Sequence, residues 1–293
     1  MTRLGVHPPI TAVRQAVALA LAEDLGPLGD VTAALLPGGA RVTAVVVARA
    51  AGVVAGRLAA METFTLVDPQ VEVEWLADDG STVAPDDVVA RVQGPLASVL
   101  TAERTALNFL CHLSGIATLT RRFIDAAAPG GSALIWDTRK TTPGLRAQEK
   151  AAVRAGGGAN HRGNLSEWVL LKDNHLTGLG IAEAVARARA RWPGRTVEVE
   201  ADHLGQVGEA IAAGADLVLL DNMGPEEVSR CVDARGAARR PLLEVSGGVT
   251  LATVRAYAAT GVDLISVGAL THSAPALDLG LDIASHVDTA GDS

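Results

Sequence analysis

The pattern of hydrophobic and polar positions divides the chain into two parts. In the first part, helical periodicity alternates with short Val-rich runs that are typical of strands. Residues 11–25 predict an N-capped helix that ends at Gly26 and Pro27, and residues 57–67 predict a second helix. We expect strands at residues 41–50, 52–56, 71–76 and 87–92. The first part is therefore predicted to be a mixed α/β region.

A long helical pattern covers residues 96–127, with an expected interruption at residues 114–115. One row of this helix is apolar, and Arg104 falls in that row. The other members of the row are Leu100, Leu107 and Cys111. Two interpretations are open: Arg104 reaches water or pairs locally with Glu103, or it binds an anion in a site that another subunit can provide.

After residue 131 the pattern changes to short apolar strands that alternate with Ala-rich helices. We expect strands at residues 133–136, 168–171, 196–200, 217–220, 242–245 and 264–267. We expect helices at residues 181–191, 204–213, 225–234 and 251–259. Such repetition predicts buried parallel strands in a barrel or a doubly wound sheet. Six strands rather than eight favour an incomplete barrel, and no GxGxxG motif follows a strand, which weakens the dinucleotide-binding alternative.

Composition narrows the classes of function. Hydrophobic residues make up 48% of the 293 residues and aromatic residues only 3%, so the core is expected to consist of Ala, Val, Leu and Ile. The net charge of -8 argues against nucleic-acid or anionic-membrane partners and favours small molecules. Cys111 and Cys231 lack the spacing of a disulfide framework or a thiolate zinc site. No signal peptide is recognisable and no apolar run reaches the length of about 20 residues that spans a membrane, so we expect a cytoplasmic protein.

Polar residues and glycines follow nearly every expected strand of the second part. Ligands bind at the carboxyl ends of parallel strands, so these residues are the candidate site. They are Asp137-Thr138-Arg139-Lys140, Lys172-Asp173-Asn174-His175, Glu200, Asp221-Asn222, Ser246-Gly247-Gly248 and Gly268-Ala269. Residues 137–175 also hold seven Lys and Arg against four Asp and Glu, whereas the remainder holds 18 against 29. This reversal of sign predicts an anion site, and the alternative is a solvated basic face.

The glycine turns after the last two strands predict a phosphate site, because backbone N–H groups of such turns bind phosphate in barrels. The alternative is a tight βα turn without a ligand. Glu200 and Asp221 end consecutive strands, where carboxylates can bind sugar hydroxyls, a hydrated Mg²⁺ or both. Glycoside hydrolysis and helix capping are the alternatives for these acids. On strict alternation Glu198 shares a face with Glu200, and the sequence leaves its role open.

Five basic side chains accompany these acids. They can neutralise two carboxylates or a pyrophosphate, since each charge-assisted hydrogen bond contributes about 1.5 to 3 kcal/mol. They are Arg139, Lys140, His161, Arg162 and Lys172. A lysine at a strand end also admits a Schiff-base aldolase with Lys172 as the nucleophile. Arg146, Lys150 and Arg154 are expected to be charges on a helix surface.

Motifs along almost the whole chain resemble those of the quinolinate phosphoribosyltransferases. The most specific are Asp137-Thr138-Arg139-Lys140 and Lys172-Asp173-Asn174-His175. The others are residues 29–32, 103–108, 141–144, 156–158, 160–162, 198–200, 220–223, 246–248 and 266–273. Val245 and Gly163-Asn164 depart from the family's pattern. A paralogous group linked to molybdenum transport shares the fold, but the Arg139-Lys140 and His161-Arg162 pairs favour the biosynthetic enzymes.

The resemblance implies a fold and an activity. The fold is an N-terminal mixed α/β sandwich over residues 1–112 and an incomplete, open α/β barrel over residues 113–274, with residues 275–293 packing back on the first domain. The activity is phosphoribosyl transfer from phosphoribosyl pyrophosphate to quinolinate with decarboxylation, which gives nicotinate mononucleotide, pyrophosphate and CO₂ in NAD biosynthesis. Mg²⁺ is the implied cofactor, held by Glu200 and Asp221. The implied assembly is a homodimer or a higher oligomer.

The resemblance also implies roles for the site residues. Quinolinate is expected to contact Arg139, His161, Arg162 and Lys172, with Arg104 entering from the partner subunit. Phosphoribosyl pyrophosphate and its metal are expected at Lys140, Glu200, Asp221, Ser246, Gly247, Gly248 and Gly268. Thr138, Ala269 and Leu270 complete the implied substrate-binding set. Catalysis is assigned to Lys140, Lys172, Glu200 and Asp221, and the order of decarboxylation and transfer stays open.

Overall fold

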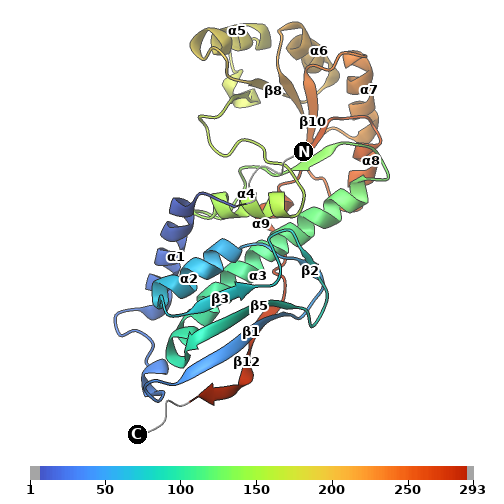
Figure 1. Cartoon of the computed structure of the whole chain (residues 1–293). Helices are drawn as coiled ribbons and strands as arrows, with labels where there is room; N and C mark the ends of the chain where they lie inside the picture. Colours follow the sequence, from blue (N-terminus) through green and yellow to red (C-terminus); the bar gives the residue numbers. More distant parts are fainter. Residues whose placement is uncertain (1–6, 289–293) are drawn as a thin grey trace. The chain divides into compact units, whose positions relative to one another are not determined.

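The computed structural model describes residues 7–288, which form two compact units (Figure 1). The first unit contains residues 7–119, 141–157 and 273–288, and the second contains residues 120–140 and 158–272. The domain boundaries expected from the sequence assign residues 141–157 to the barrel. By its packing, that segment belongs to the first unit.

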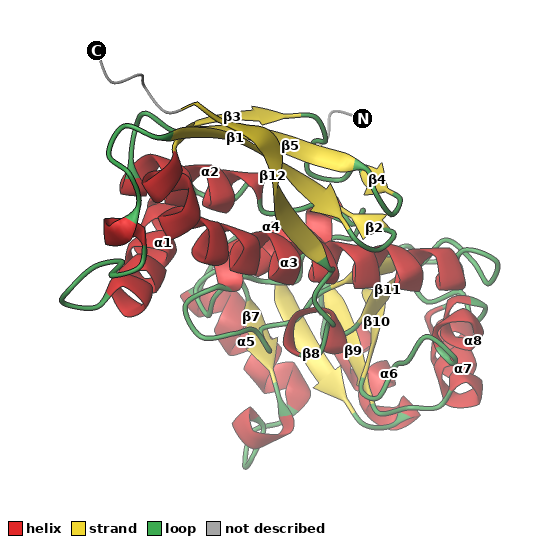
Figure 2. Ribbon diagram, turned by 90° about the horizontal axis from the view of Figure 1, so that it is seen from below, coloured by secondary structure: helices red, strands yellow, loops and turns green. Residues whose placement is uncertain are grey.

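The first unit combines antiparallel strands with helices. Its helices are α1 (Ile10–Leu25), the 3-10 helix η1 (Ala33–Leu35), α2 (Arg57–Val67), α3 (Leu96–Ala127), whose last turns belong to the second unit, and α4 (Arg146–Ala155). Its strands are β1 (Arg41–Ala48), β2 (Gly52–Val53), β3 (Glu72–Trp75), β4 (Thr82–Val83), β5 (Val88–Pro95) and β12 (Leu279–Asp288). The main sheet has the order β12-β1-β5-β3, and β2 pairs with β4 separately. Figure 2 shows α1, α2 and α3 on one side of the main sheet.

The core of the first unit is built from small aliphatic residues, as the composition predicts. On β1, Ala44 and Val46 are buried, and their antiparallel partners on β5 are Val92 and Ala90. Helix α3 adds Val99, Ala102, Ala106 and Leu110 to the same cluster. Strand β12 pairs with β1, so the segment after residue 278 completes the sheet. Residues 289–293 of the segment expected to pack back lie outside the described residues.

Helix α3 is continuous, so the expected interruption at Ser114 and Gly115 is wrong. Ser114 is fully buried, and its hydroxyl donates to the Ala55 carbonyl and accepts the Ala55 N–H at 2.9 Å. A Cβ on Gly115 would lie 2.9 Å from the Ala276 Cα. These two small residues let other chain segments approach the helix closely, and they do not break it.

Helix α4 is buried on more than one face, which corrects the expectation that Lys150 is a surface charge. Lys150 is only 6% exposed, and Gln148 and Glu149 beside it are buried. Arg146 and Arg154 are half-buried. The helix packs on α1, and the Gln148 amide donates to the Ala12 carbonyl at 3.1 Å. Helix α4 therefore lies in the interior of the first unit, although its polar sequence is typical of a surface helix.

The second unit alternates strands and helices along the chain. Its strands are β6 (Leu134–Trp136), β7 (Val169–Leu171), β8 (Val197–Ala201), β9 (Leu217–Asp221), β10 (Leu242–Ser246) and β11 (Leu264–Ser266). Its helices are the 3-10 helix η2 (Asp173–His175), α5 (Ile181–Arg191), α6 (Leu204–Ala212), α7 (Pro225–Arg235), α8 (Val254–Ala258) and α9 (Ala269–His272). All six strands lie close to their predicted positions.

The strand order makes this unit an open barrel. The six strands are parallel and follow the order β6-β11-β10-β9-β8-β7. From β7 to β11, each strand pairs with the strand that follows it in the sequence. The first strand of the unit, β6, pairs with the last, β11. A doubly wound sheet would reverse its order in the middle, so that alternative is excluded. Within the described residues β6 and β7 are the two edges, which confirms the predicted incomplete barrel.

Among residues 7–288, no helix is both long enough and apolar enough to cross a membrane.

Candidate active site

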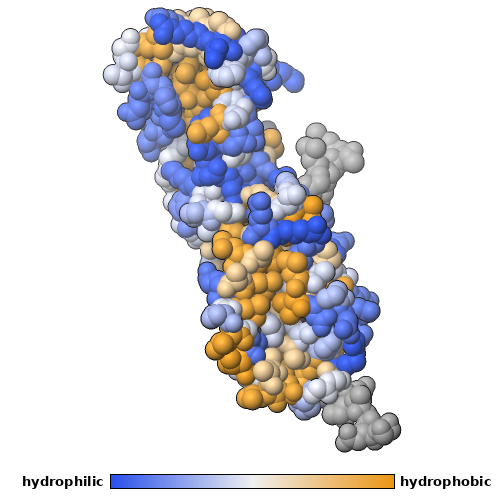
Figure 3. Space-filling model, turned by 90° about the vertical axis from the view of Figure 1, so that its left-hand side faces the viewer, coloured by the Kyte–Doolittle hydropathy of each residue, from blue (hydrophilic) through white to orange (hydrophobic). Residues whose placement is uncertain are grey.

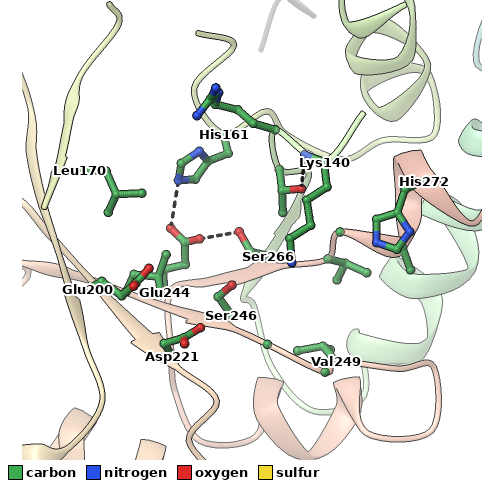
Figure 4. A pocket seen from close by; sticks show the side chains of 18 of the residues that line it. Lys140, His161, Leu170, Glu200, Asp221, Glu244, Ser246, Val249, Ser266 and His272 are labelled. Atoms are coloured by element: carbon green, nitrogen blue, oxygen red, sulfur yellow. Dashed lines mark hydrogen bonds and ion pairs between the residues drawn. The ribbon is translucent and has the colours of Figure 1, made fainter. Parts of the chain in front are cut away.

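A cavity of about 580 Å³ opens at the carboxyl ends of the barrel strands (Figure 4). Parallel strands bring their carboxyl ends to one edge, which is why residues far apart in the sequence meet here. Most of the predicted site residues line this cavity: Thr138, Arg139, Lys140, His161, Arg162, Lys172, Glu200, Asp221, Ser246, Gly247, Gly248, Gly268 and Ala269.

Two predicted residues do not line the cavity. Arg104 is exposed on α3 in the first unit, and Leu270 is fully buried on α9. Several lining residues were not among the predicted site residues: Leu170, Leu219, Glu244, Val249, Thr250, Ser266, Val267 and His272. Leu219 and Glu244 lie two residues before Asp221 and Ser246 in their strands. Alternation along a strand was therefore the signal that could have found them.

A buried carboxylate ties two of the cationic segments together. Asp137 follows β6 and is fully buried. Its Oδ1 accepts the His161 backbone N–H at 3.0 Å, and its Oδ2 accepts a hydrogen bond from Asn160 Nδ2 at 2.5 Å. These hydrogen bonds compensate for the burial of the acid. These hydrogen bonds also hold the segment that contains Arg139 next to the segment that contains His161.

The backbone of Lys140 is fixed on both sides, while its side chain is exposed. Its N–H donates to Thr138 Oγ1 at 3.0 Å, and its carbonyl accepts from Thr271 Oγ1 at 2.8 Å. A Cβ on Gly268 would lie 3.3 Å from Lys140 Cδ. The glycine therefore leaves room for the lysine stem beside the turn that follows β11.

Arg162 is a buried cation at the cavity wall. It is 6% exposed, and its Nη1 donates to the Trp168 carbonyl at 3.2 Å. Burial lowers the pKa of Arg162, while the charge of Glu198 acts in the opposite direction. Because an arginine starts from a pKa far above neutral, it remains charged and can bind an anion here.

Glu200 and Asp221 supply carboxylates from consecutive strands. The Lys172 ammonium forms an ion pair with Glu200, and Asn222 Nδ2 donates to Asp221 Oδ2 at 2.7 Å. Burial raises the pKa of Glu200; Lys172 lowers it, and the charge of Asp221 raises it further. The two acids are thus near enough to influence each other, which suits a shared cation or sugar hydroxyls.

The turn after β10 depends on glycine. Gly247 and Gly248 have φ values of 100° and 61°, in the left-handed region. A Cβ on Gly247 would overlap the Asn222 side-chain oxygen and lie 2.8 Å from its Cγ. Asn222, itself at φ 55°, donates its N–H to the Ser246 carbonyl at 2.9 Å. The backbone of this turn is therefore open toward the cavity, as a phosphate site requires.

A second pair of acids, Glu198 and Glu244, lies beside His161, and Glu244 also lines the cavity. Glu198 and Glu244 are 0% and 1% exposed, and each has a carboxylate oxygen near His161 Nε2. Burial acts to raise the pKa of Glu198. The interactions of Glu198 with His161, Glu244 and Trp168 outweigh this effect, so the pKa is lowered. Burial and the charge of Glu198 raise the pKa of Glu244 well above its usual value. The two pKa values therefore move apart, and Glu198 is the more readily ionised acid of the pair.

An open α/β barrel whose strand ends combine cations, two acids and glycine turns defines a class: a barrel enzyme that acts on small phosphorylated anions. Sequence models identify the family within that class. The model described as "Quinolinate phosphoribosyl transferase, C-terminal domain" matches residues 116–282, and the corresponding N-terminal domain model matches residues 30–114. The chain belongs to the quinolinate phosphoribosyl transferase family.

Individual relatives agree with this assignment. The "Nicotinate-nucleotide pyrophosphorylase [carboxylating]" of Mycobacterium leprae is 43% identical over 278 residues, which is 93% of this chain and 97% of that protein. A probable enzyme of the same name from Bacillus subtilis is 42% identical and covers 89% of this chain and 90% of its own. The solved nicotinate-nucleotide pyrophosphorylase from Francisella tularensis superposes with a TM-score of 0.90 at 40% identity, covering 94% of this chain and 97% of that chain.

Proposed function

We propose that this protein transfers the phosphoribosyl group of phosphoribosyl pyrophosphate to quinolinate, with decarboxylation. The products are nicotinate mononucleotide, pyrophosphate and CO₂, in NAD biosynthesis. The observation that carries the proposal is the gathering of the five predicted basic side chains, the acids Glu200 and Asp221, and two glycine turns in one cavity. The names of the relatives are those of enzymes for this reaction.

Quinolinate is a ring dicarboxylate, and the proposal places it against Arg139, His161, Arg162 and Lys172. Arg162 is buried, so its charge is weakly screened and favours an anion strongly, and the buried His161 lies beside it at the cavity wall. Two arginines suit two carboxylates, because guanidinium groups bind carboxylates in a bidentate manner. These cations also hold the ring while one carboxylate loses CO₂ in a site with little water.

Phosphoribosyl pyrophosphate is proposed to lie on the other side, against Lys140 and the glycine turns. Ser246, Gly247, Gly248 and Gly268 present backbone toward the cavity, and Thr138 and Ala269 line it beside them. The transfer passes through a transition state in which the ribose resembles a cation and the pyrophosphate departs with negative charge. Lys140 would stabilise that departing charge. Leu270 would act by supporting the α9 turn, since its side chain is buried.

Mg²⁺ fits the donor set of Glu200 and Asp221, which we propose as its ligands. Carboxylate oxygens are the ligands that Mg²⁺ prefers, and these two acids line the same cavity from the neighbouring strands β8 and β9. When bound, Mg²⁺ would neutralise charge on the pyrophosphate. The acids themselves would orient the ribose hydroxyls. Lys172 holds Glu200 in place through their ion pair.

We also propose a cytoplasmic homodimer in which Arg104 serves the partner's cavity. Arg104 is exposed, and the first unit also exposes large apolar side chains: Leu19, Leu28, Val31 and Leu35. Figure 3 shows apolar groups gathered on one face of the molecule. Exposed apolar patches of this kind are typical of protein–protein contacts. A higher oligomer built from such dimers remains compatible with this proposal.

The test is product formation by purified, folded protein. We expect nicotinate mononucleotide from quinolinate, phosphoribosyl pyrophosphate and Mg²⁺, detected by mass spectrometry. The aldolase alternative requires a neutral amine, whereas Lys172 is in an ion pair with Glu200. Borohydride trapping of a substrate on Lys172 would support that alternative. Tight binding of both substrates without turnover would instead indicate a binding protein, and either result contradicts the proposal.

A further inference from the structure

A buried acidic pair lies behind His161, and the proposed function gives it no role. Glu198 of β8 is 0% exposed and Glu244 of β10 is 1% exposed. Burying two acids is costly unless they are paired and hydrogen-bonded. Two acids beneath an anion cavity also oppose anion binding unless a nearby cation balances them. We therefore expect the role of these two acids to involve the residues of the cavity, and His161 in particular.

Both acids face the same atom of His161. The distance from His161 Nε2 is 3.3 Å to Glu198 Oε2 and 3.7 Å to Glu244 Oε2. The Trp168 indole N–H donates to Glu198 Oε2 at 2.8 Å, and the Ser266 hydroxyl donates to Glu244 Oε1. Figure 4 shows His161, Glu244 and Ser266 joined in a chain below the cavity. The two carboxylates are thus held in place by donors from neighbouring strands and loops.

The ring of His161 is also held on its sides. Trp136 contacts it edge-on with ring centroids 5.0 Å apart, and Trp168 lies at 4.9 Å. The histidine is only 7% exposed, yet it lines the cavity. Other charged groups at this position are Arg162, which interacts electrostatically with Glu198, and Arg139, which interacts with Arg162. The imidazole is therefore fixed by aromatic packing and by acids at one nitrogen.

We infer that Glu198 and Glu244 are positioning residues that hold the His161 imidazole through Nε2 and thereby set the affinity of the cavity for quinolinate. The inference rests on the proposed function, in which His161 contacts quinolinate. An acid behind a histidine fixes the ring orientation and keeps a proton on the nitrogen that faces the acid. A ring held in this way keeps one orientation at the cavity wall, where the proposed function places a quinolinate carboxylate.

The test compares two isosteric substitutions, Glu198→Gln and Glu244→Gln. We expect Glu198→Gln to raise the KM for quinolinate about tenfold, because a hydrogen bond to a charged group is lost. Glu244→Gln should have a smaller effect of the same kind, since its contact is longer. The KM for phosphoribosyl pyrophosphate should stay within about twofold of wild type for both, because a charge removed behind His161 leaves the glycine turns intact. A purely structural role would change both KM values, or kcat, together.

Two further variants test whether the effect on the quinolinate KM is specific to the acids beside His161. Trp168→Phe removes the indole donor of Glu198 and keeps an aromatic ring beside His161, so the quinolinate KM should rise while that for phosphoribosyl pyrophosphate does not. Glu62→Gln is the matched control, because Glu62 is a carboxylate in the first unit that is 7% exposed and pairs with Arg14 at 3.0 Å. It should leave both KM values unchanged. Calorimetric titration with quinolinate checks each affinity without turnover.

The outcomes separate this inference from the proposed function. An inactive wild-type protein overturns the function, and the inference falls with it. An active wild type whose quinolinate KM is unchanged in Glu198→Gln and Glu244→Gln overturns the inference alone. The ligand atoms of His161, Glu198 and Glu244 lie within 4.8 Å of one another, as in a metal site. One equivalent of tightly held transition metal in wild type, lost in Glu244→Gln, would also overturn the inference. If Glu198→Gln does not fold, Glu244→Gln and Trp168→Phe decide the question.

Discussion

At the scale of single residues, the glycine turn after β10 shows how a backbone conformation makes a binding site. Gly247 is at φ 100°, and its missing side chain leaves space for the Asn222 amide. Asn222 in turn donates its backbone N–H to Ser246. The turn therefore depends on three residues in the left-handed region, Asn222 after β9 and Gly247 and Gly248 after β10.

Gly247→Ala should disturb the phosphate side of the cavity and leave the quinolinate side intact. A Cβ would overlap Asn222 and strain the backbone, so we expect the KM for phosphoribosyl pyrophosphate to rise by about tenfold or more, as for a displaced phosphate contact. Steady-state kinetics with each substrate varied in turn measures this. Gly208→Ala on α6 is the control, since a Cβ there meets nothing within 4 Å. Equal loss of affinity for both substrates would contradict the proposed division of the cavity.

The sequence predicted the residues that follow strands and missed those that lie within them. Arg139, Lys172 and Asp221 stand where a buried strand gives way to polar residues, and that signal is visible without a structure. Glu244 and Ser266 face the cavity from inside β10 and β11. The role of a buried acid in an apolar strand depends on partners elsewhere in the chain, such as His161, and the pattern of that strand alone does not identify these partners. The roles of all these residues remain predictions.

At the scale of elements, α3 shows why small residues are ambiguous signals. Ser114 and Gly115 were expected to interrupt the helix, because both are poor helix formers. In the structure both residues lie where other chain segments contact α3. The Ser114 hydroxyl is hydrogen-bonded to the backbone of Ala55, and Pro275 and Ala276 lie against Gly115. Tertiary contacts outweigh the propensity cost of about 1 kcal/mol for a glycine. The contacts involved are distant in sequence, so helical periodicity alone could not show them.

Gly115→Ala should destabilise the protein even though alanine favours helices. Its Cβ would overlap the Pro275 carbonyl and lie 2.9 Å from Ala276 Cα, and both are backbone atoms that cannot easily move. We expect the free energy of unfolding to fall by about 1 to 3 kcal/mol, the usual cost of overpacking. Urea denaturation measures this. Gly208→Ala serves again as the control and should be neutral or stabilising. A stabilised Gly115→Ala protein would contradict the close approach seen here.

Asp216 joins the start of β8 to the end of α5, and its contribution should depend on pH. It accepts the Val197 N–H at 2.8 Å and pairs with Arg189 at 2.9 Å. Burial acts to raise the pKa of Asp216, but these two contacts outweigh it and the pKa is lowered. A lowered pKa adds stability above the unfolded value of about 3.9, and this stability is lost as the pH falls through the lower folded value.

Asp216→Asn therefore should lower the free energy of unfolding by about 1 kcal/mol at pH 7, where the lost contacts are charge-assisted. The difference from wild type should shrink below about pH 4, because the wild-type carboxylate becomes protonated. Denaturant unfolding at pH 7 and at lower pH values measures both quantities. A difference that stays constant over that range would show that the charge of Asp216 does not stabilise the fold.

At the scale of the whole molecule, the chain forms two units whose sequences are interleaved. Residues 141–157 lie between two barrel strands in sequence but pack within the first unit, and β12 returns to the first sheet at the end of the chain. The alternation of strands and helices predicted an open barrel correctly, because six buried parallel strands leave few other arrangements. The same pattern could not place α4 in the first unit, because its buried polar residues contact partners distant in sequence, such as Ala12 and His112.

The proposed homodimer predicts complementation between two inactive variants. Arg104→Ala should lack the arginine supplied to the partner, and Lys172→Ala should lack a group within its own cavity. Mixed dimers of the two chains would contain one intact site, so we expect recovery of up to about a quarter of wild-type activity when equal amounts assort at random. Activity after unfolding and refolding the mixture measures this. Each variant refolded alone is the control, and inactive dimers that demonstrably contain both chains would refute the shared site.

The stoichiometry of the reaction tests the central claim most directly, because one cavity is proposed to bind both substrates and catalyse both the transfer and the decarboxylation. Purified protein would be incubated with Mg²⁺, phosphoribosyl pyrophosphate and quinolinate labelled in the carboxylate that is lost. We predict equal amounts of CO₂, pyrophosphate and nicotinate mononucleotide, and no CO₂ when phosphoribosyl pyrophosphate is left out. Folded wild-type protein that releases none of these products would contradict the account.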